Sequence, residues 1–401
     1  MVSAPRTTDG SDLPLSGTTV VDLTRFVSGS YCTMLLAALG ARILKIEVPP
    51  GGDSYRGQGA TATATGSTLF ESINRGKHSV LLDFRTPDGA VALEAMLAEA
   101  DFFVQNARPG SLDAYGLGYD EVHARHPHLV YASISAFGDT GPEAERGGFD
   151  LIVQAESGVM SVTGSAEYGP VKVGPPILDI GAGLSATLAI VAAHTTRQRT
   201  GVGSKVSSSL LEFALAGLTT FMADVVANGQ QPPLLGSHSP TFSPYGAFAA
   251  SDGHIVIAGT GSDRLWPLLC DLLDRPDLID DERYADNAAR LRHRDALTAE
   301  IETALSRRRV VDWLGIFDAA GLPATTVRSL GEVLASPQVD ALDIVRQPTH
   351  SSQQGGVDAP FRFDDERPTL SAAPTLGADT RTVLESFGVD PGVIDRLAGP
   401  R

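Results

Sequence analysis

Strand and helix patterns alternate along the first half of this chain, and this alternation constrains the fold more than any other feature. Residues 19–23 form an apolar run that predicts a buried strand, residues 31–39 predict a helix ended by Gly40, and residues 42–46 predict the next strand. A helix between two such strands makes a β-α-β unit, and repeated units build parallel sheets.

The alternation continues to about residue 218. Further strands are predicted at residues 79–82, 102–104, 129–135 and near 205–206, and further helices at 86–100, after Asp179 and from about 209. We therefore expect a doubly wound, Rossmann-like α/β domain over residues 13–218, preceded by a disordered leader of residues 1–12.

The pattern changes after residue 218. A Pro-, Gly- and Ser-rich linker (230–244) is followed by two short strands (246–250 and 254–258). Helices are predicted around 262–273, 290–306 and 310–320. Residues 219–330 thus predict a smaller α+β domain with its linker. Residues 331–401 contain a loose polar stretch and a last helix near 380–387.

The bulk composition excludes several classes of function. The 401 residues carry a net charge of −17, which argues against general binding to nucleic acid. We find no uninterrupted apolar run of membrane-spanning length, and neither the nine histidines nor the two cysteines show metal-ligand spacing. Dinucleotide, P-loop and nucleophile-elbow motifs are also absent. A cytoplasmic protein that binds no membrane and no metal is expected.

Asp179 is the first candidate for chemistry. It ends an apolar run and stands just before a predicted helix that begins with the small residues Gly181, Ala182 and Gly183. The positive end of that helix would favour the ionised carboxylate, and an ionised, partly desolvated carboxylate is a nucleophile. The simpler alternative is that Asp179 only caps the helix.

Other polar residues follow predicted strands, where ligands of open parallel sheets bind. The loop that begins with Asn106 and Arg108 is either a ligand loop or a turn. Lys77 and Arg85 belong to a basic cluster that suits phosphate, although a solvated edge explains them equally well. The loop Gly259-Thr260-Gly261 is either a flap over a site or a tight connection, and Asp150 is most simply a helix cap.

Ten short motifs occur in a fixed order along the chain: Val21-Asp22-Leu23-Thr24, residues 40–47, Asn74-Arg75-Gly76-Lys77, residues 106–110, Gly148-Phe149-Asp150, Asp179, and residues 201–206, 251–254, 320–323 and 374–377. In this order they resemble the class III CoA-transferases, the CaiB/BaiF-type family, from about Leu13 to Leu397. The resemblance implies that CoA moves from an acyl-CoA donor to a carboxylate acceptor, with CoA as a substrate and no permanently bound cofactor.

The resemblance also implies roles for particular residues. Asp179 would attack the thioester, form a mixed anhydride and then carry CoA as an aspartyl thioester. Glycine-bearing residues 259–261 match the family's active-site loop. Residues implied to contact CoA are Val27, Ser28, Leu82, Arg85 and Asn106. Val48 and Ala114 replace basic residues of some members, which Arg25, Lys77 and Arg108 could compensate.

Phe149 separates this chain from a related activity. The 2-methylacyl-CoA racemases share the fold and use a histidine in a Gly-His-Asp motif, where this chain has Phe149, which cannot take a proton. A racemase-like isomerase and a non-catalytic CoA-ester binding protein remain the alternatives, and Phe149 is expected in the substrate pocket. The broken glycine run at 259–261 makes oxalate a less expected acid. The family's fold further implies a homodimer of two interlocked rings, with residues after 330 returning to the large domain.

Overall fold

The computed structural model describes residues 13–59, 61–260, 262, 264–346 and 355–399. These residues divide into two compact units, and each is described by itself. The first comprises the described residues of Met1–Ser157, Val173–Thr219 and Pro337–Arg401, and the second comprises Gly158–Lys172 and Thr220–Ser336. Residues 158–172, which we expected in the large domain, therefore belong to the second unit, and the chain rejoins the first unit at Pro337 rather than at 331.

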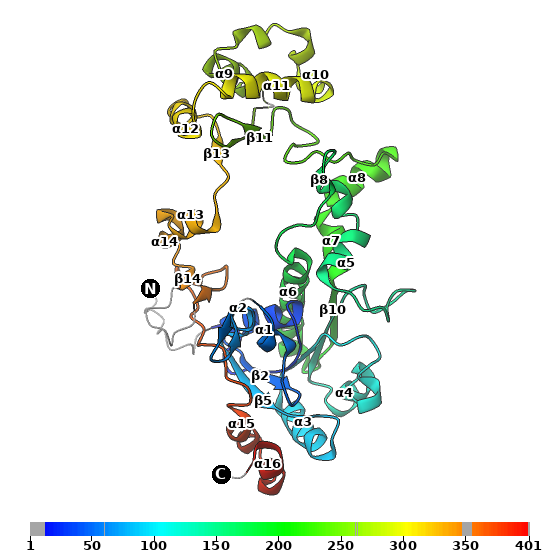
Figure 1. Ribbon diagram of the computed structural model, residues 1–401. Coiled ribbons are helices and arrows are strands. Elements are labelled where there is room, and N and C mark those ends of the chain that lie inside the picture. Colours follow the sequence, from blue (N-terminus) through cyan, green and yellow to red (C-terminus); the bar gives the residue numbers. More distant parts are fainter. Residues whose placement is uncertain (1–12, 60, 261, 263, 347–354, 400–401) are drawn as a thin grey trace, which may run out of the picture. The chain divides into compact units, whose positions relative to one another are not determined.

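A six-stranded parallel sheet forms the centre of the first unit (Figure 1). Its strands are β1 (Thr19–Leu23), β2 (Arg42–Glu47), β5 (Lys77–Leu81), β6 (Phe102–Gln105), β7 (Val130–Ser135) and β10 (Lys205–Ser209). Their order in the sheet is β10-β7-β6-β1-β2-β5. The chain thus builds outward from β1 in one direction and returns to β6 on its other side, which is the doubly wound order with a switch point between β1 and β6.

The main helices of this unit follow from local sequence signals. They are α1 (Ser28–Ala38), α3 (Pro87–Glu99), α5 (Asp150–Glu156), α6 (Ile177–Thr200) and α7 (Leu210–Gly217). Helix α3 begins with Thr86 as a side-chain cap and Pro87 in its first turn. Helix α6 packs against α1, β7 and β10.

The core of this unit shows the alternation expected of strands with two covered faces. Val21, Leu44, Phe103 and Tyr131 are neighbours across four strands and belong to one buried cluster. That cluster includes residues of α3 and of the C-terminal helices α15 (Thr380–Ser386) and α16 (Pro391–Ala398). The last segment of the chain therefore packs on the sheet.

Several short elements were not predicted. These are α2 (Thr68–Asn74), α4 (Tyr119–Arg125), α16, the 3₁₀ turns η1 (Ser54–Gly57) and η2 (Asp113–Tyr115), and the two-residue strands β3 (Ala62–Thr63), β4 (Gly66–Ser67), β14 (Val345–Arg346) and β15 (Gly356–Val357). Most have too few residues to show a hydrophobic period. Helix α16 carried a readable signal, because Asp390 caps it and Pro391 occupies its first turn.

Helix α6 also bears on the question of membranes. By length and composition it could cross a membrane, although its apolar residues do not form an uninterrupted run, and half of its apolar window is buried within the chain. The core helix of a soluble protein meets the same criterion, so this is weak evidence for a span.

The second unit is α+β. Strands β11 (Gly246–Ala249), β12 (His254–Ile257) and β13 (Ala324–Thr326) form an antiparallel sheet, and β8 (Gly164–Ser165) pairs with β9 (Gly169–Pro170). Its helices and 3₁₀ turns are η3 (Met160–Val162), α8 (Thr219–Asn228), α9 (Leu265–Leu272), η4 (Pro276–Leu278), η5 (Glu282–Tyr284), α10 (Asn287–Arg292), α11 (Arg294–Leu305), α12 (Val310–Ala319) and α13 (Leu330–Leu334), and α14 (Pro337–Ala341) follows in the first unit. The helix predicted at 290–306 is two helices, with a break at His293.

Candidate active site

Two adjoining pockets lie at the carboxyl ends of the parallel strands, within the first unit. They have volumes of about 460 and 540 Å³ and share Leu23, Arg25 and Ala107. Leu23 ends β1, and Ala107 follows β6, so the pockets meet at the switch point between these strands. This crevice is where open α/β sheets bind ligands.

Asn106 joins the two sides of the crevice. Its side-chain oxygen accepts a hydrogen bond from the backbone N–H of Arg25 at 2.9 Å, and its side-chain amide donates to the backbone carbonyl of Arg25 at 2.6 Å. The residue expected to contact CoA therefore also holds the loop after β1 beside the loop after β6. Arg108 follows in the same loop and lines the second pocket.

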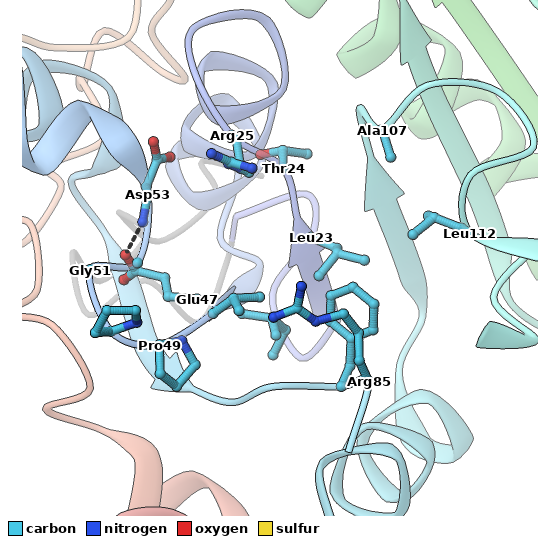
Figure 2. Close-up of a pocket in the computed structure, with 15 residues that line it drawn as sticks. Leu23, Thr24, Arg25, Glu47, Pro49, Gly51, Asp53, Arg85, Ala107 and Leu112 are labelled. Carbon is cyan, nitrogen blue, oxygen red and sulfur yellow. Dashed lines mark hydrogen bonds between the residues drawn. The ribbon is translucent and has the colours of Figure 1, made fainter. Parts of the chain in front are cut away.

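The first pocket lies beside the loop that follows β2. Figure 2 shows Arg25 and Arg85 on opposite sides of this pocket, with Pro49 and Leu112 along its walls. Arg85 pairs through two nitrogens with the carboxylate of Asp83, at 2.7 and 2.8 Å. A phosphate bound there would have to share the guanidinium of Arg85 with Asp83.

Two of the residues that were predicted to contact CoA, Leu82 and Lys77, are buried. Leu82 is fully buried in the core cluster and does not line either pocket. The ammonium of Lys77 is fully buried, where it pairs with Asp22 at 3.2 Å and donates to the backbone carbonyl of Ser30 at 2.9 Å. Burial lowers the pKa of Lys77 to about 8, although the carboxylate of Asp22 opposes this shift. Lys77 therefore supports strand β1 and helix α1, and it does not line either pocket.

Lys45, on strand β2, supports the loop that follows β1. Its buried ammonium pairs with Asp53 at 3.0 Å and donates to the backbone carbonyl of Thr24 at 3.0 Å. Asp22 accepts from the N–H of Thr24 at 2.9 Å and from its hydroxyl at 2.6 Å. These buried charges are paired, as burial of charge requires, and they fix the backbone from which Arg25, Phe26 and Ser28 reach the pockets.

Asp179 lines the second pocket and lies in the first turn of α6. The helix begins at Ile177, before Asp179 rather than after it, so Asp179 is inside the helix and is not its cap. A Cβ atom at Gly183 would lie 2.5 Å from the carbonyl oxygen of Ser28. The glycine therefore permits the close approach of α6 to α1, which brings Ser28 beside Asp179.

The electrostatic environment of Asp179 differs from the expectation. Burial, together with the nearby carboxylate of Asp150, raises the pKa of Asp179 to about 7, and a hydrogen bond from Ser28 opposes the rise. The prediction that the helix N-terminus favours the ionised form is therefore wrong. Asp150 accepts the N–H of Leu178 at 2.8 Å and that of Asp179 at 3.3 Å, so Asp150 occupies the amides at this end of α6. The prediction that Asp150 caps its own helix is also wrong.

Aromatic side chains form one wall of the second pocket. The ring of Phe26 lies edge to face with those of Tyr55 and Phe149, with ring centroids 5.7 Å apart in both cases. Phe149 is 66% exposed in the chain, and Phe26 has a positive φ of 61°, which is uncommon for a residue with a side chain. Among the described residues that line this pocket, Asp179 is the one carboxylate, and none is a histidine, cysteine or lysine.

The remaining predicted residues are more dispersed. Val27 precedes α1 with its side chain buried, and Ser28 lines the second pocket. Gly259 and Thr260 lie in the second unit, where the hydroxyl of Thr260 donates to the carbonyl of Pro244, and Gly261 lies outside the described residues. Within the described part of the chain, no group of acidic, His and Cys residues is suited to hold a metal ion.

Known proteins resemble this chain over nearly its whole length. Residues 15–380 match the model of CoA-transferase family III. Succinyl-CoA:glutarate CoA-transferase of Mus musculus is 34% identical over 98% of this chain and 91% of its own length, and acetyl-CoA:oxalate CoA-transferase of Acetobacter aceti is 36% identical over 92% and 95%. A crystal structure of a CaiB/BaiF family protein from Brucella suis superimposes with a TM-score of 0.84, at 34% identity, over 94% of this chain and 99% of that one. The chain therefore belongs to CoA-transferase family III, a family of enzymes that transfer CoA.

Proposed function

We propose that this protein is an acyl-CoA:carboxylate CoA-transferase in which Asp179 is the covalent nucleophile. The observation that carries the proposal is the position of Asp179 as the one carboxylate among the described residues that line the pocket at the sheet's switch point. Because its pKa is raised to about 7, its carboxylate is a stronger base, and a better nucleophile, than an ordinary aspartate.

The reaction proceeds in four displacements. The carboxylate of Asp179 attacks the thioester carbon, the C–S bond breaks, and CoA thiolate leaves a mixed anhydride on Asp179. The thiolate then attacks the aspartyl carbon of the anhydride, which expels the donor acid as its carboxylate and leaves an aspartyl-CoA thioester. The acceptor carboxylate attacks this thioester and expels the thiolate. The thiolate finally attacks the acyl carbon of the new anhydride, which frees Asp179. No net proton is gained or lost.

We propose that CoA occupies the two pockets in a defined direction. We place its nucleotide in the pocket beside Arg25 and Arg85, and its thioester in the pocket that contains Asp179. Pantetheine would cross the shared boundary at Leu23 and Ala107, next to Asn106.

The racemase alternative is less well supported. Proton transfer at an α-carbon needs a second titratable group across from Asp179, and Phe149 occupies the position that resembles the racemase histidine. Among the described residues of this pocket, Tyr55 is the nearest candidate, but burial and the charge of Asp179 raise its pKa above the ordinary value of 10.0. Such a phenol is a poor acceptor of protons at neutral pH.

The names of the relatives suggest a panel of candidate donor and acceptor acids to test. Succinyl-CoA and acetyl-CoA would be offered as donors, with glutarate, mesaconate and oxalate as acceptors. Oxalate is included despite the broken glycine run, because the Acetobacter aceti relative is named for it.

The decisive experiment is trapping of the covalent intermediate. Incubation with a donor followed by hydroxylamine should convert Asp179 to its hydroxamate, which mass spectrometry of the peptide would locate. Asp179→Asn should abolish both the adduct and CoA transfer, whereas Asp139→Asn, which alters a carboxylate paired with Lys205, should retain both. Full transfer activity in Asp179→Asn would refute the proposal.

We further propose a homodimer of interlocked rings in the cytoplasm, acting without nucleic acid or membrane partners. Leu184 and Leu188 on α6 are 49% and 72% exposed in the chain alone, which supports burial of this helix by a second copy. Light scattering of the purified protein should give twice the chain mass of 42.0 kDa, and a monomer would contradict the proposal.

A further inference from the structure

Asp150 contacts the backbone of Asp179 but does not line either pocket. It is the first residue of α5 and is 9% exposed, yet its carboxylate caps a different helix. One oxygen accepts the backbone N–H groups of Leu178 and Asp179, at 2.8 and 3.3 Å. These amides belong to the first turn of α6, whose N-terminal N–H groups have no partner within the helix.

Gln154, one turn further along α5, holds Asp150 in place. Its side-chain amide donates to the other oxygen of Asp150, and its carbonyl accepts the N–H of Val173 at 2.9 Å. Gln154 is fully buried. The pair therefore connects α5 with both the start of α6 and the segment that leads into it, and it leaves the carboxylate of Asp150 little freedom to turn elsewhere.

This arrangement has a chemical consequence for the neighbouring carboxylate. A carboxylate that accepts hydrogen bonds from helix N-terminal amides is stabilised as an anion and becomes less basic. Here Asp150 accepts those bonds, and its negative charge lies next to Asp179. The hydroxyl of Ser28 supplies a hydrogen bond to the carboxylate of Asp179.

We propose that Asp150 is a positioning residue for CoA transfer, which fixes the first turn of α6 and withholds the amides of that turn from the carboxylate of Asp179. The inference rests on the proposed function of Asp179 as nucleophile. The raised pKa of Asp179, to which the charge of Asp150 contributes after burial, agrees with it. A basic, weakly stabilised carboxylate attacks a thioester more readily than one held by several amides.

Other charged and titratable groups also surround this pair. Tyr55 from η1 and the arginines of three loops line the same pocket, and α7, which packs against α5 and α6, carries Glu212, which accepts from Ser209 at 2.7 Å. The three arginines are Arg25, Arg108 and Arg146. Arg146 is already paired with Glu143 and Glu156. Asp150 differs from all of them because it contacts the backbone of Asp179 itself.

The first test is the pH profile of CoA transfer in Asp150→Asn. In the unaltered protein, kcat/KM for the acyl-CoA should rise through about pH 7, as Asp179 ionises. In Asp150→Asn, this midpoint should fall by about one pH unit or more, because a like charge has been removed. At pH 8, kcat should fall about tenfold, with KM changed by less than about twofold. Asp139→Asn should leave the midpoint unchanged.

A second variant separates charge from shape. Asp150→Glu keeps the charge but moves the carboxylate away from the amides of α6, which then become available to Asp179, so both its kcat and its midpoint should fall. If Asp150→Asn does not fold, Asp150→Glu still decides, since an unchanged midpoint in this charge-retaining variant would show that the amides are not withheld and would overturn the proposal. An unchanged midpoint in folded Asp150→Asn would overturn it equally.

A third measurement distinguishes failure of this inference from failure of the proposed function. Carbodiimide activates protonated carboxyls, so labelling of Asp179 with an amine, followed by mass spectrometry, reports its titration without any substrate. Labelling relative to the exposed Glu99 should persist to about pH 7 and end at lower pH in Asp150→Asn. A shifted labelling midpoint without any CoA transfer would refute the function and support the role of Asp150. Transfer with identical labelling midpoints would do the reverse.

Discussion

Replacing Asp179 with Asn should stabilise the protein while abolishing its activity. The pKa of Asp179 rises from 3.8 to about 7 on folding, mainly because burial penalises the charged form. The native state therefore retains a proton between about pH 4 and pH 7 that the unfolded chain has lost. Because the native state binds more protons in this window, its stability decreases as pH rises through it and is constant above it.

The size of the effect follows from the shift. A difference of about three pH units corresponds to about 4 kcal/mol, since one unit is 1.36 kcal/mol. Water that reaches the pocket screens part of this penalty, so we expect a gain of about 2 kcal/mol for Asp179→Asn at pH 8. For a unit of this size, that raises the unfolding temperature by about 5 °C.

Thermal and urea unfolding at pH 5 and pH 8 would measure the gain. At pH 5, most of the penalty is absent from the unaltered protein, so the advantage of Asp179→Asn should be less than half of its value at pH 8. Glu99→Gln, which removes a carboxylate from the exposed end of α3, serves as the control and should show little change. An advantage equal at both pH values, or absent at pH 8, would refute the assignment of a buried, destabilising charge to Asp179.

Three further predictions concern the support of the site. Gly183→Ala would place a Cβ 2.5 Å from the carbonyl oxygen of Ser28, so we expect a loss of about 2 kcal/mol in urea unfolding together with reduced kcat. Asn106→Ala removes both hydrogen bonds to the backbone of Arg25 and should raise the Kd for CoA about tenfold in calorimetry, with the unfolding temperature little changed. Lys45→Met leaves the buried carboxylate of Asp53 without its partner and should cost about 3 kcal/mol in urea unfolding, and a neutral result would show that water compensates the charge.

Local sequence patterns predicted most of the sheet. The strands β1, β2, β6 and β7 are short apolar runs between loops, and each begins and ends within two residues of its prediction. The strand before α3 was placed two residues late, because β5 begins with the polar residues Lys77 and His78. Polar residues hide a strand from a hydrophobic pattern, and here the lysine is buried through an ion pair instead.

Candidate residues of the site were found with uneven success. Asp179, Ser28, Asn106 and Arg108 all line the second pocket, because the carboxyl ends of parallel strands and the helices after them meet at one edge of the sheet. Phe26 was not selected from the sequence, although it contacts Phe149 in that pocket. A lone aromatic residue in a loop carries no signal until its neighbours are known.

The sequence by itself determined the class of fold, the family and the identity of the candidate nucleophile, since each depends on residue types in a linear order. Only the tertiary structure decided the electrostatic state of that nucleophile. Asp150 lies 29 residues before Asp179, and folding brings its carboxylate onto the amides of α6. Lys77 is buried in the core, where it pairs with Asp22, 55 residues away. Burial and charge partners arise from contacts between distant segments, and such contacts have no local pattern from which to read them.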